Sequence, residues 1–173
     1  MRSSFAVGCL FTAFLAVLVQ GCASDYSWRT TVPDDMRTVA VPTFRNESEV
    51  QELGPLMSGQ LAREFQREGT FKLRREGDAA LEIQGVVKSA GSGIATYDRR
   101  SGMRVTSHEM VAKVVVSVID KRNGKVLVDN RPYSATASFA AIQDISTAQR
   151  DASGRVAEDL AAQVVDDVLN LKW

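Results

Sequence analysis

The sequence predicts an α+β domain, a two-layer sandwich in which two helices pack on one face of a mainly antiparallel sheet of four or five strands. Apolar residues recur at helical spacing in segments 46–68 and 146–171. Between these segments, residues 81–87, 105–119 and 126–139 have β character. Strands that follow one another, with helices before and after them, are typical of this fold class.

Residues 1–21 match a lipoprotein signal peptide. Arg2 places a positive charge near the N-terminus, as in a signal peptide. The apolar run 5–19 is shorter than the roughly 20 residues that a transmembrane helix needs. Gly21 precedes Cys22, as at a bacterial lipoprotein processing site; an ordinary secretory signal with an incidental cysteine is the less favoured alternative. We therefore expect cleavage before Cys22 and a lipid on its sulfur, which would anchor the chain to a membrane.

The remaining chain divides into a tether and one domain. Residues 22–36 are rich in Ser, Thr and Asp, contain Pro33 and lack an apolar period, so we expect an extended lipidated tether. Residues 37–173 are enough for a single hydrophobic core. After cleavage no cysteine other than Cys22 remains, which excludes a disulfide. The balance of 21 basic and 21 acidic residues gives no reason to expect nucleic acid as a partner.

The domain is predicted to open with a strand and a helix. Residues 38–41 alternate valines with smaller neighbours and stop at Pro42, which lacks a backbone donor. In segment 46–68 an apolar residue recurs at every fourth position, and Gly69 follows where a helix would end. These apolar positions are Leu53, Met57, Leu61 and Phe65.

The three longer strands are expected to form a meander, after a brief extended segment at 71–73. Residues 110–119 alternate between two faces of a strand. One face is apolar and is expected to be buried in the core, and the other is mixed and is expected to face solvent or a partner. The apolar series is Met110, Ala112, Val114, Val116 and Val118, and the mixed series is Val111, Lys113, Val115, Ser117 and Ile119.

Turn signals separate these strands. Asn123-Gly124 predicts a hairpin with a primed turn, because both residue types tolerate positive φ. Residues 99–102 predict a second turn, and Gly91-Ser92-Gly93 is interpreted as a bend.

A closing helix is expected over residues 146–171, where apolar positions again share one face. Ser146 and Gln149 are predicted to form its capping box, and Gly154 weakens its interior by about 1 kcal/mol relative to alanine. The apolar face consists of Val156, Leu160, Val164, Val168 and Leu171.

Residues for catalysis or metal binding are scarce. His108 is the single histidine, and its neighbour Glu109 would point to the opposite face of a strand, so the two are not expected to act as an acid–base pair. One histidine without a free thiolate does not support a zinc site. We expect no catalytic residue, no metal and no cofactor.

Several segments in order resemble the lipopolysaccharide-assembly lipoprotein family, LptE. The resemblance spans nearly all of the chain after Cys22, with Ala23-Ser24-Asp25 before Tyr26 as a departure from the family's shorter spacing. The matching segments are Cys22 with Tyr26, Thr38-Val39-Ala40-Val41-Pro42 with Phe44-Arg45-Asn46, Leu61-Ala62-Arg63-Glu64-Phe65, Asp78-Ala79 before Leu81 and Gly85, and Gly124-Lys125-Val126-Leu127.

The resemblance implies a lipid-anchored protein of the outer membrane that faces the periplasm or lies inside the lumen of the β-barrel LptD. Such a protein is not an enzyme: it plugs the barrel, assists barrel assembly and helps to deliver lipopolysaccharide to the outer leaflet. The alternative is another periplasm-facing lipoprotein of similar pattern, such as a peptidoglycan-synthase activator or a secretion-channel component. A lipid-tethered hydrolase is disfavoured by the scarcity of catalytic residues.

Lipopolysaccharide carries phosphates, so a direct binding site should gather Arg or Lys side chains. Two predicted turns carry such clusters, although charged hairpin tips are also common for solubility. The candidate residues are Arg99, Arg100 and Arg104 at the first turn, and Lys121, Arg122 and Lys125 at the second.

Overall fold

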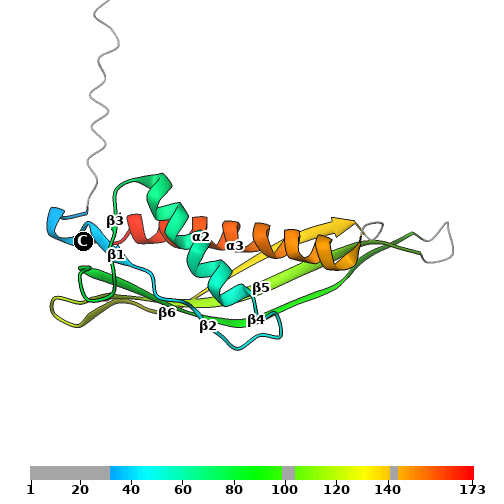
Figure 1. The fold of residues 1–173 in the computed structure, drawn as a ribbon, viewed down its shortest axis with the longest axis horizontal. Helices are drawn as coiled ribbons and strands as arrows, with labels where there is room; N and C mark the ends of the chain where they lie inside the picture. Colours follow the sequence, from blue (N-terminus) through cyan, green and yellow to red (C-terminus); the bar gives the residue numbers. More distant parts are fainter. Residues whose placement is uncertain (1–31, 99–103, 141–143) are drawn as a thin grey trace, which may run out of the picture.

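Two helices lie on one face of a six-stranded sheet, which confirms the predicted α+β class (Figure 1). The structure is a computed structural model and describes residues 32–98, 104–140 and 144–173. The elements are the 3₁₀-helix η2 (Asp34–Met36), β1 (Thr38–Ala40), β2 (Arg45–Asn46), α2 (Leu53–Glu68), β3 (Lys72–Leu73), β4 (Leu81–Asp98), β5 (Arg104–Asp120), β6 (Lys125–Ala140) and α3 (Ile145–Leu169).

The sheet is mixed. The strand order is β3-β1-β4-β5-β6, and β2 also pairs with β4. The long strands β4, β5 and β6 form the predicted antiparallel meander, whereas the short strands β1, β2 and β3 all pair in parallel. Strands of two or three residues carry too little alternation for their direction to be read from the sequence.

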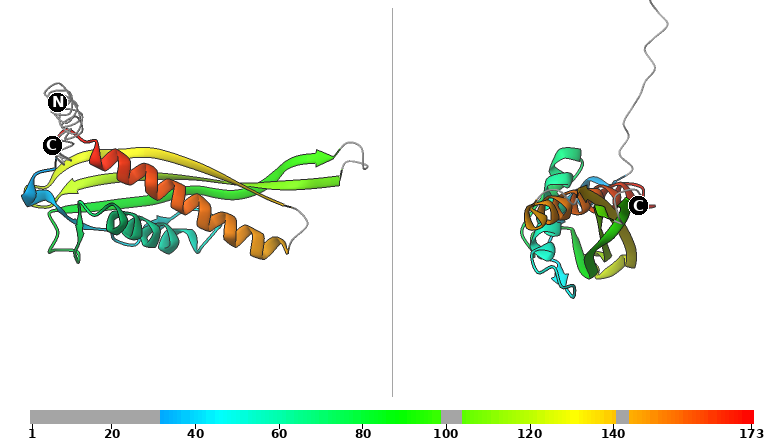
Figure 2. Two further views of the ribbon diagram at one scale, coloured as in Figure 1. Left: turned by 90° about the horizontal axis from the view of Figure 1, so that it is seen from above. Right: turned by 90° about the vertical axis from the view of Figure 1, so that its right-hand side faces the viewer.

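The strands β4 and β5 extend further than the sequence pattern indicates. β4 continues from Leu81 to Asp98, and Gly91-Ser92-Gly93 lies within regular pairing to β5, so the predicted bend is wrong. Backbone hydrogen bonds to β5, rather than side-chain alternation, hold this segment extended. Its tip projects beyond both helices, and we call residues 89–98 and 104–113 the distal hairpin (Figure 2).

Both helices bury the predicted faces. The four apolar positions of α2 have no exposed surface, and Gly69 ends the helix in a left-handed conformation (φ 85°), with its N–H donating to Phe65 O at 3.1 Å. In α3, Asp144 is the N-cap and accepts from Ser146 N at 3.2 Å, so the predicted capping box at Ser146 is wrong. Leu171 lies beyond the end of α3.

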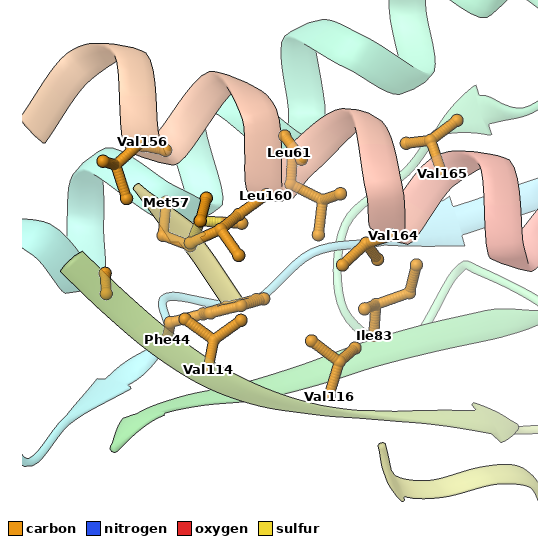
Figure 3. Close-up of a cluster of buried hydrophobic side chains, with 14 of the residues drawn as sticks. Phe44, Met57, Leu61, Ile83, Val114, Val116, Val156, Leu160, Val164 and Val165 are labelled. Carbon is orange, nitrogen blue, oxygen red and sulfur yellow. The ribbon is translucent and has the colours of Figure 1, made fainter. Parts of the chain in front are cut away.

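The core lies between the helices and the sheet (Figure 3). Phe44, from the loop before β2, places its ring beside Val114 and Leu160. Gly85 of β4 makes this possible, because a Cβ atom at Gly85 would come within 2.1 Å of the Phe44 ring. A residue without a side chain in β4 is therefore what allows the N-terminal segment to dock.

One end of the molecule gathers the start of the described chain, the β5–β6 turn and the C-terminus (Figures 1 and 2). Val32 is 2% exposed and belongs to the core, so the chain is already fixed to the domain at this point. We call this region, with Val32, residues 121–124 and Trp173, the tether end. The distal hairpin projects from the opposite end.

Candidate functional site

The sheet face that carries no helix forms a shallow groove of about 560 Å³. Cross-strand pairs build its floor: Val86 lies opposite Val115, and Gln84 lies opposite Ser117. The predicted alternation of β5 is confirmed, because its apolar series is at most 1% exposed and its mixed series faces the open side. The groove combines half-buried valines with amide and hydroxyl groups, and charged side chains also line it, so its surface is not strongly apolar.

Asn130 also lines this groove, and sequence reasoning missed it. It adopts a left-handed backbone conformation (φ 44°) next to the register shift between Val116 and Val118. Its N–H donates to Ser117 Oγ at 2.9 Å, which joins β6 to the groove floor. The available signal was an Asp-Asn pair inside a strand pattern, because these residues tolerate positive φ at a bulge.

The second candidate region is the β5–β6 turn at the tether end. The predicted hairpin is confirmed, but the predicted primed turn at Asn123-Gly124 is wrong, because Asn123 does not have positive φ. Asp120 pairs with Lys125, so the loop has four residues, and Gly124 alone in it has positive φ (72°). The N–H of Gly124 donates to Asp120 O at 2.8 Å and closes the loop.

Arg122 in this turn is held by carboxylates of its own chain. Its Nε donates to Asp120 Oδ1 at 3.0 Å and its Nη2 to Asp120 Oδ2 at 2.9 Å, in a two-pronged contact. Asp120 is fully buried, and the hydrogen bond from Arg122 lowers the pKa of its carboxyl although burial opposes this. Nη1 of Arg122 also pairs with Asp35 of η2. The guanidinium therefore holds the turn to the domain.

The two lysines of this turn differ. Lys121 pairs with the buried Glu82 at 2.9 Å, and hydrogen bonds from Gln84 and then Lys121 lower the pKa of that carboxyl. Lys125 has no ion pair within residues 32–98, 104–140 and 144–173. The predicted cluster is thus assembled in space, but two of its three cations already have acidic partners.

Lys125 and Lys172 line a second groove, of about 350 Å³, that sequence reasoning did not anticipate. Its apolar side includes Leu127 and Trp173, and the Nε1 atom of Trp173 is buried without a hydrogen-bond partner in the described structure. The combination of two ammonium groups with apolar walls suits an amphipathic anion. Lys172 comes from the chain terminus, so only the folded structure brings it beside the turn.

The remaining predicted site residues are not tested by the structure. Cys22, Arg99 and Arg100 lie outside the described residues. Arg104 begins β5 opposite Asp98, and its side chain is not among those described. Their proposed roles therefore stay predictions.

His108 takes part in packing. It is half-buried and stacks on Phe139, with ring centroids 5.4 Å apart and an interplanar angle of 18°. No group of three or more metal-ligating side chains occurs among the described residues. Within the same part of the chain, no helix has the length and apolar character needed to cross a membrane.

Solved structures share this fold at low sequence identity. A protein from Xanthomonas campestris matches with a TM-score of 0.54 and 12% identity, covering 76% of this chain and 82% of its own. A hypothetical protein from Chlamydia trachomatis matches with a TM-score of 0.52 and 16% identity, covering 78% and 96%. A minor lipoprotein from Acinetobacter baumannii matches with a TM-score of 0.50 and 15% identity, covering 78% and 93%. These likenesses show the fold alone.

Sequence comparison identifies the family. No curated protein matches the chain. The family model described as "LptE: Lipopolysaccharide-assembly" matches residues 36–168, which include every described strand, all of α2, and α3 up to its penultimate residue. The chain belongs to the LptE lipopolysaccharide-assembly family.

Proposed function

We propose that this protein is a lipid-anchored outer-membrane protein that plugs an LptD-type β-barrel, assists its assembly and helps to deliver lipopolysaccharide to the outer leaflet. The observation that carries the proposal is the family match over residues 36–168. The scarcity of catalytic groups supports action by binding and shape, without bond-making chemistry.

The position of the tether end supports the anchored orientation. Val32, the first described residue, is fixed in the core at this end, and Cys22 precedes it by a short segment. Extended chain spans at most roughly 3.5 Å per residue, so a lipid on Cys22 would hold the tether end near the membrane. The distal hairpin would then point away from the anchor.

The helix-free sheet face is the surface that we assign to the barrel wall. The lumen of an outer-membrane barrel is polar, and a plug must match it with a polar surface. The groove floor of Gln84, Ser117 and two half-buried valines is not strongly apolar, and the charged residues Arg45, Glu76, Glu82 and Asp129 that also line the groove add to its polar character.

For lipopolysaccharide we assign the groove beside Lys125 and Lys172. Ammonium groups suit lipid phosphates, and the apolar wall at Trp173 suits the start of an acyl chain. Arg122 also lines this groove, but Arg122 and the neighbouring Lys121 have acidic partners, so we expect both to contribute less than Lys125. The turn with Arg99, Arg100 and Arg104 is the second predicted contact.

The test is copurification of the full-length protein with the large LptD-type barrel of the same organism. We expect a stable complex in detergent extracts of outer membranes that is lost on heating. Val115→Lys, on the open face, should weaken the complex, whereas Ile145→Lys, 55% exposed at the start of α3, should not. Copurification with a peptidoglycan synthase or a secretion channel, and not with the barrel, would contradict the proposal.

The membrane anchor has a separate test. The Cys22→Ser protein should fail to acquire lipid, measured by mass spectrometry of the purified chain, and should leave the outer-membrane fraction. A wild-type protein whose Cys22 carries no lipid would contradict the anchor, whereas retention of the unacylated variant in that fraction would show that the barrel complex alone suffices to hold the protein there.

A further inference from the structure

Asn123, in the β5–β6 turn, differs from the other asparagines of the chain because glycine follows it. Asn46, Asn130 and Asn170 all precede larger residues. Asparagine before glycine loses its side-chain amide most readily, since glycine has no side chain to keep its backbone nitrogen away from the asparagine Cγ atom. Asn123 and Gly124 are both exposed, so water reaches them. The turn therefore contains a chemically labile position that the proposed function does not use.

The reaction takes place between two neighbouring groups of the chain. The backbone nitrogen of Gly124 loses its proton to hydroxide and attacks Cγ of Asn123. The bond from Cγ to Nδ2 breaks, and ammonia leaves with a proton supplied by water, so that a five-membered imide remains. Water then opens the imide at either carbonyl carbon, which gives an aspartate or an isoaspartate at this position. The reaction requires only that the Gly124 nitrogen reaches Asn123 Cγ.

In the folded turn, both reacting groups are held in other contacts. The N–H of Gly124 donates to Asp120 O at 2.8 Å, so the proton that must leave is engaged. Oδ1 of Asn123 accepts from Lys125 N at 2.8 Å. The pKa of the Asp120 carboxyl is lowered first by Arg122 and also by a hydrogen bond from the Asn123 side chain, so this side chain is held at a second point. The turn must open before the nitrogen can attack.

Arg122 ties the closed turn to the domain. Its guanidinium binds Asp120, at the base of the turn, through contacts of 3.0 Å and 2.9 Å, and it also pairs with Asp35 of η2. Asp120 is fully buried, and η2 is distant from the turn in sequence. We call these three side chains the Arg122 clasp. A turn that is tied at two points opens only in rare local fluctuations.

We propose that Asn123 is a latent modification site, which converts to aspartate and isoaspartate when the turn opens, and that the Arg122 clasp sets how often it opens. Closing of the turn is fast compared with the chemistry. The rate in the folded protein is then the rate in the open chain multiplied by the fraction of time that the turn is open. The modification requires water and no enzyme.

The product changes the groove beside the turn. Asn123, Lys125 and Lys172 line this groove, and neither lysine has an ion pair in the described part of the chain. A carboxylate in place of the Asn123 amide adds one negative charge near these ammonium groups, so the attraction of the groove for an anion falls. The modification thus alters the charge of the groove as the protein ages, whatever ligand the groove takes.

The experiment follows the conversion of Asn123 in the full-length protein, kept in detergent at mildly alkaline pH. Mass spectrometry of the peptide that contains this position detects the change from amide to acid, and chromatography separates aspartate from isoaspartate. Each protein is measured folded and in urea, so that its own unfolded chain is the reference. For the wild type we expect the folded rate to be at least about tenfold below the unfolded rate. Asn130, which precedes Arg131, should convert much more slowly in urea than Asn123.

Variants of the clasp test its role. Arg122→Gln removes both contacts and should raise the ratio of folded to unfolded rate by at least about fivefold. Asp35→Asn removes only the contact to η2 and should raise the ratio less, because that pair is exposed. Lys125→Gln is the matched control: it removes a cation without an ion pair from the same turn and should leave the ratio unchanged. Far-UV circular dichroism verifies that each variant is folded.

The outcomes are distinguishable. A folded wild type that converts as fast as its unfolded chain overturns the proposal, and so do equal rates at Asn123 and Asn130 in urea. Unchanged ratios in both clasp variants, or an equal rise in Lys125→Gln, overturn the role of Arg122. Hydrogen exchange at the Gly124 amide of the wild type tests the closed turn without any substitution. Its protection should match the factor by which folding slows the conversion, and an unprotected amide would contradict the proposal.

Discussion

The tether end and the distal hairpin are built from the same strands but are stabilised differently. Near the tether end, β4 and β5 lie under two helices, and buried pairs such as Asp120–Arg122 hold the turn. In the distal hairpin, the exposed β4 residues contribute backbone pairing to β5 and little buried apolar area. The comparison teaches that a long regular strand need not be evenly stable along its length: one part belongs to the core, and the other is held mainly by backbone pairing with β5.

The largest expected difference concerns side-chain truncation. Leu160→Ala removes a side chain with no exposed surface between the helix and the sheet and should lower the free energy of unfolding by about 3 kcal/mol. Ile94→Ala, in the distal hairpin, should change it by no more than about 0.5 kcal/mol. Urea unfolding of both variants, followed by circular dichroism, checks this. Equal losses would mean that the hairpin is part of the cooperative core.

The same substitution at two glycines of β4 sharpens the comparison. Gly85→Ala places a methyl group within 2.1 Å of the Phe44 ring and should destabilise the protein by about 2 kcal/mol. Gly91→Ala meets nothing within 4 Å and should be neutral or stabilising by about 0.5 kcal/mol. Unfolding midpoints of the two variants are the measurement, and a tolerated Gly85→Ala would contradict the docking of Phe44 described above.

The buried carboxylate of the tether end predicts a pH dependence. In the unfolded chain an aspartate titrates near about pH 4, and the contact with Arg122 lowers the pKa of Asp120 in the folded state. Its stabilising contribution is therefore complete above about pH 4 and is lost as the pH falls through the folded-state value. Asp120→Asn should lower the unfolding temperature most at pH 7, and its difference from the wild type should shrink on acidification.

The control for this prediction is Asp78→Asn, which removes a carboxylate from an exposed loop position. It should leave the unfolding temperature close to that of the wild type at neutral pH. A constant deficit for Asp120→Asn between pH 7 and pH 3 would show that the charge of Asp120 is not what stabilises the turn.

The smallest expected effect concerns the β6 edge of the sheet, which Gln163 of α3 covers. Gln163→Ala removes one hydrogen bond of 3.3 Å to Ser134 O and should change the free energy of unfolding by less than about 0.5 kcal/mol. Amide exchange near Ser134 should nevertheless become faster, because the cover over this part of β6 is gone. No change in exchange at β6 would mean that the side chain does not protect the edge.

The elements that the sequence predicted correctly are those in which side-chain period and burial agree. The faces of α2 and α3 and the alternation of β5 were readable because one side of each is buried with nearly no exposed surface. The strand at Gly91–Gly93 was missed because its conformation is imposed by pairing with β5 and leaves no side-chain pattern. The cap at Asp144 was missed because Ser146 fits the same capping pattern two residues later.

The candidate sites were only partly predictable for a related reason. The sequence predicted that Lys121, Arg122 and Lys125 lie on one turn. It did not indicate that the Arg122 guanidinium forms ion pairs with Asp35 and Asp120. Lys172 is far from the turn in sequence and reaches the same groove only through the fold. Local patterns indicate where charge gathers, whereas partners such as Asp35 and Glu82 come from distant segments.

The placement of Phe44 over Gly85 gives the domain an expected order of assembly. The meander of β4, β5 and β6 joins neighbours along the chain, whereas the chain between β1 or β2 and β4 contains α2 and β3, and contacts between such distant segments form late in folding. We expect the segment with β1 and β2 to dock last, after the meander of β4, β5 and β6 has formed. Pulse-labelled hydrogen exchange would reveal this as late protection at Val39 and early protection in β5, and the reverse sequence of events would rule it out.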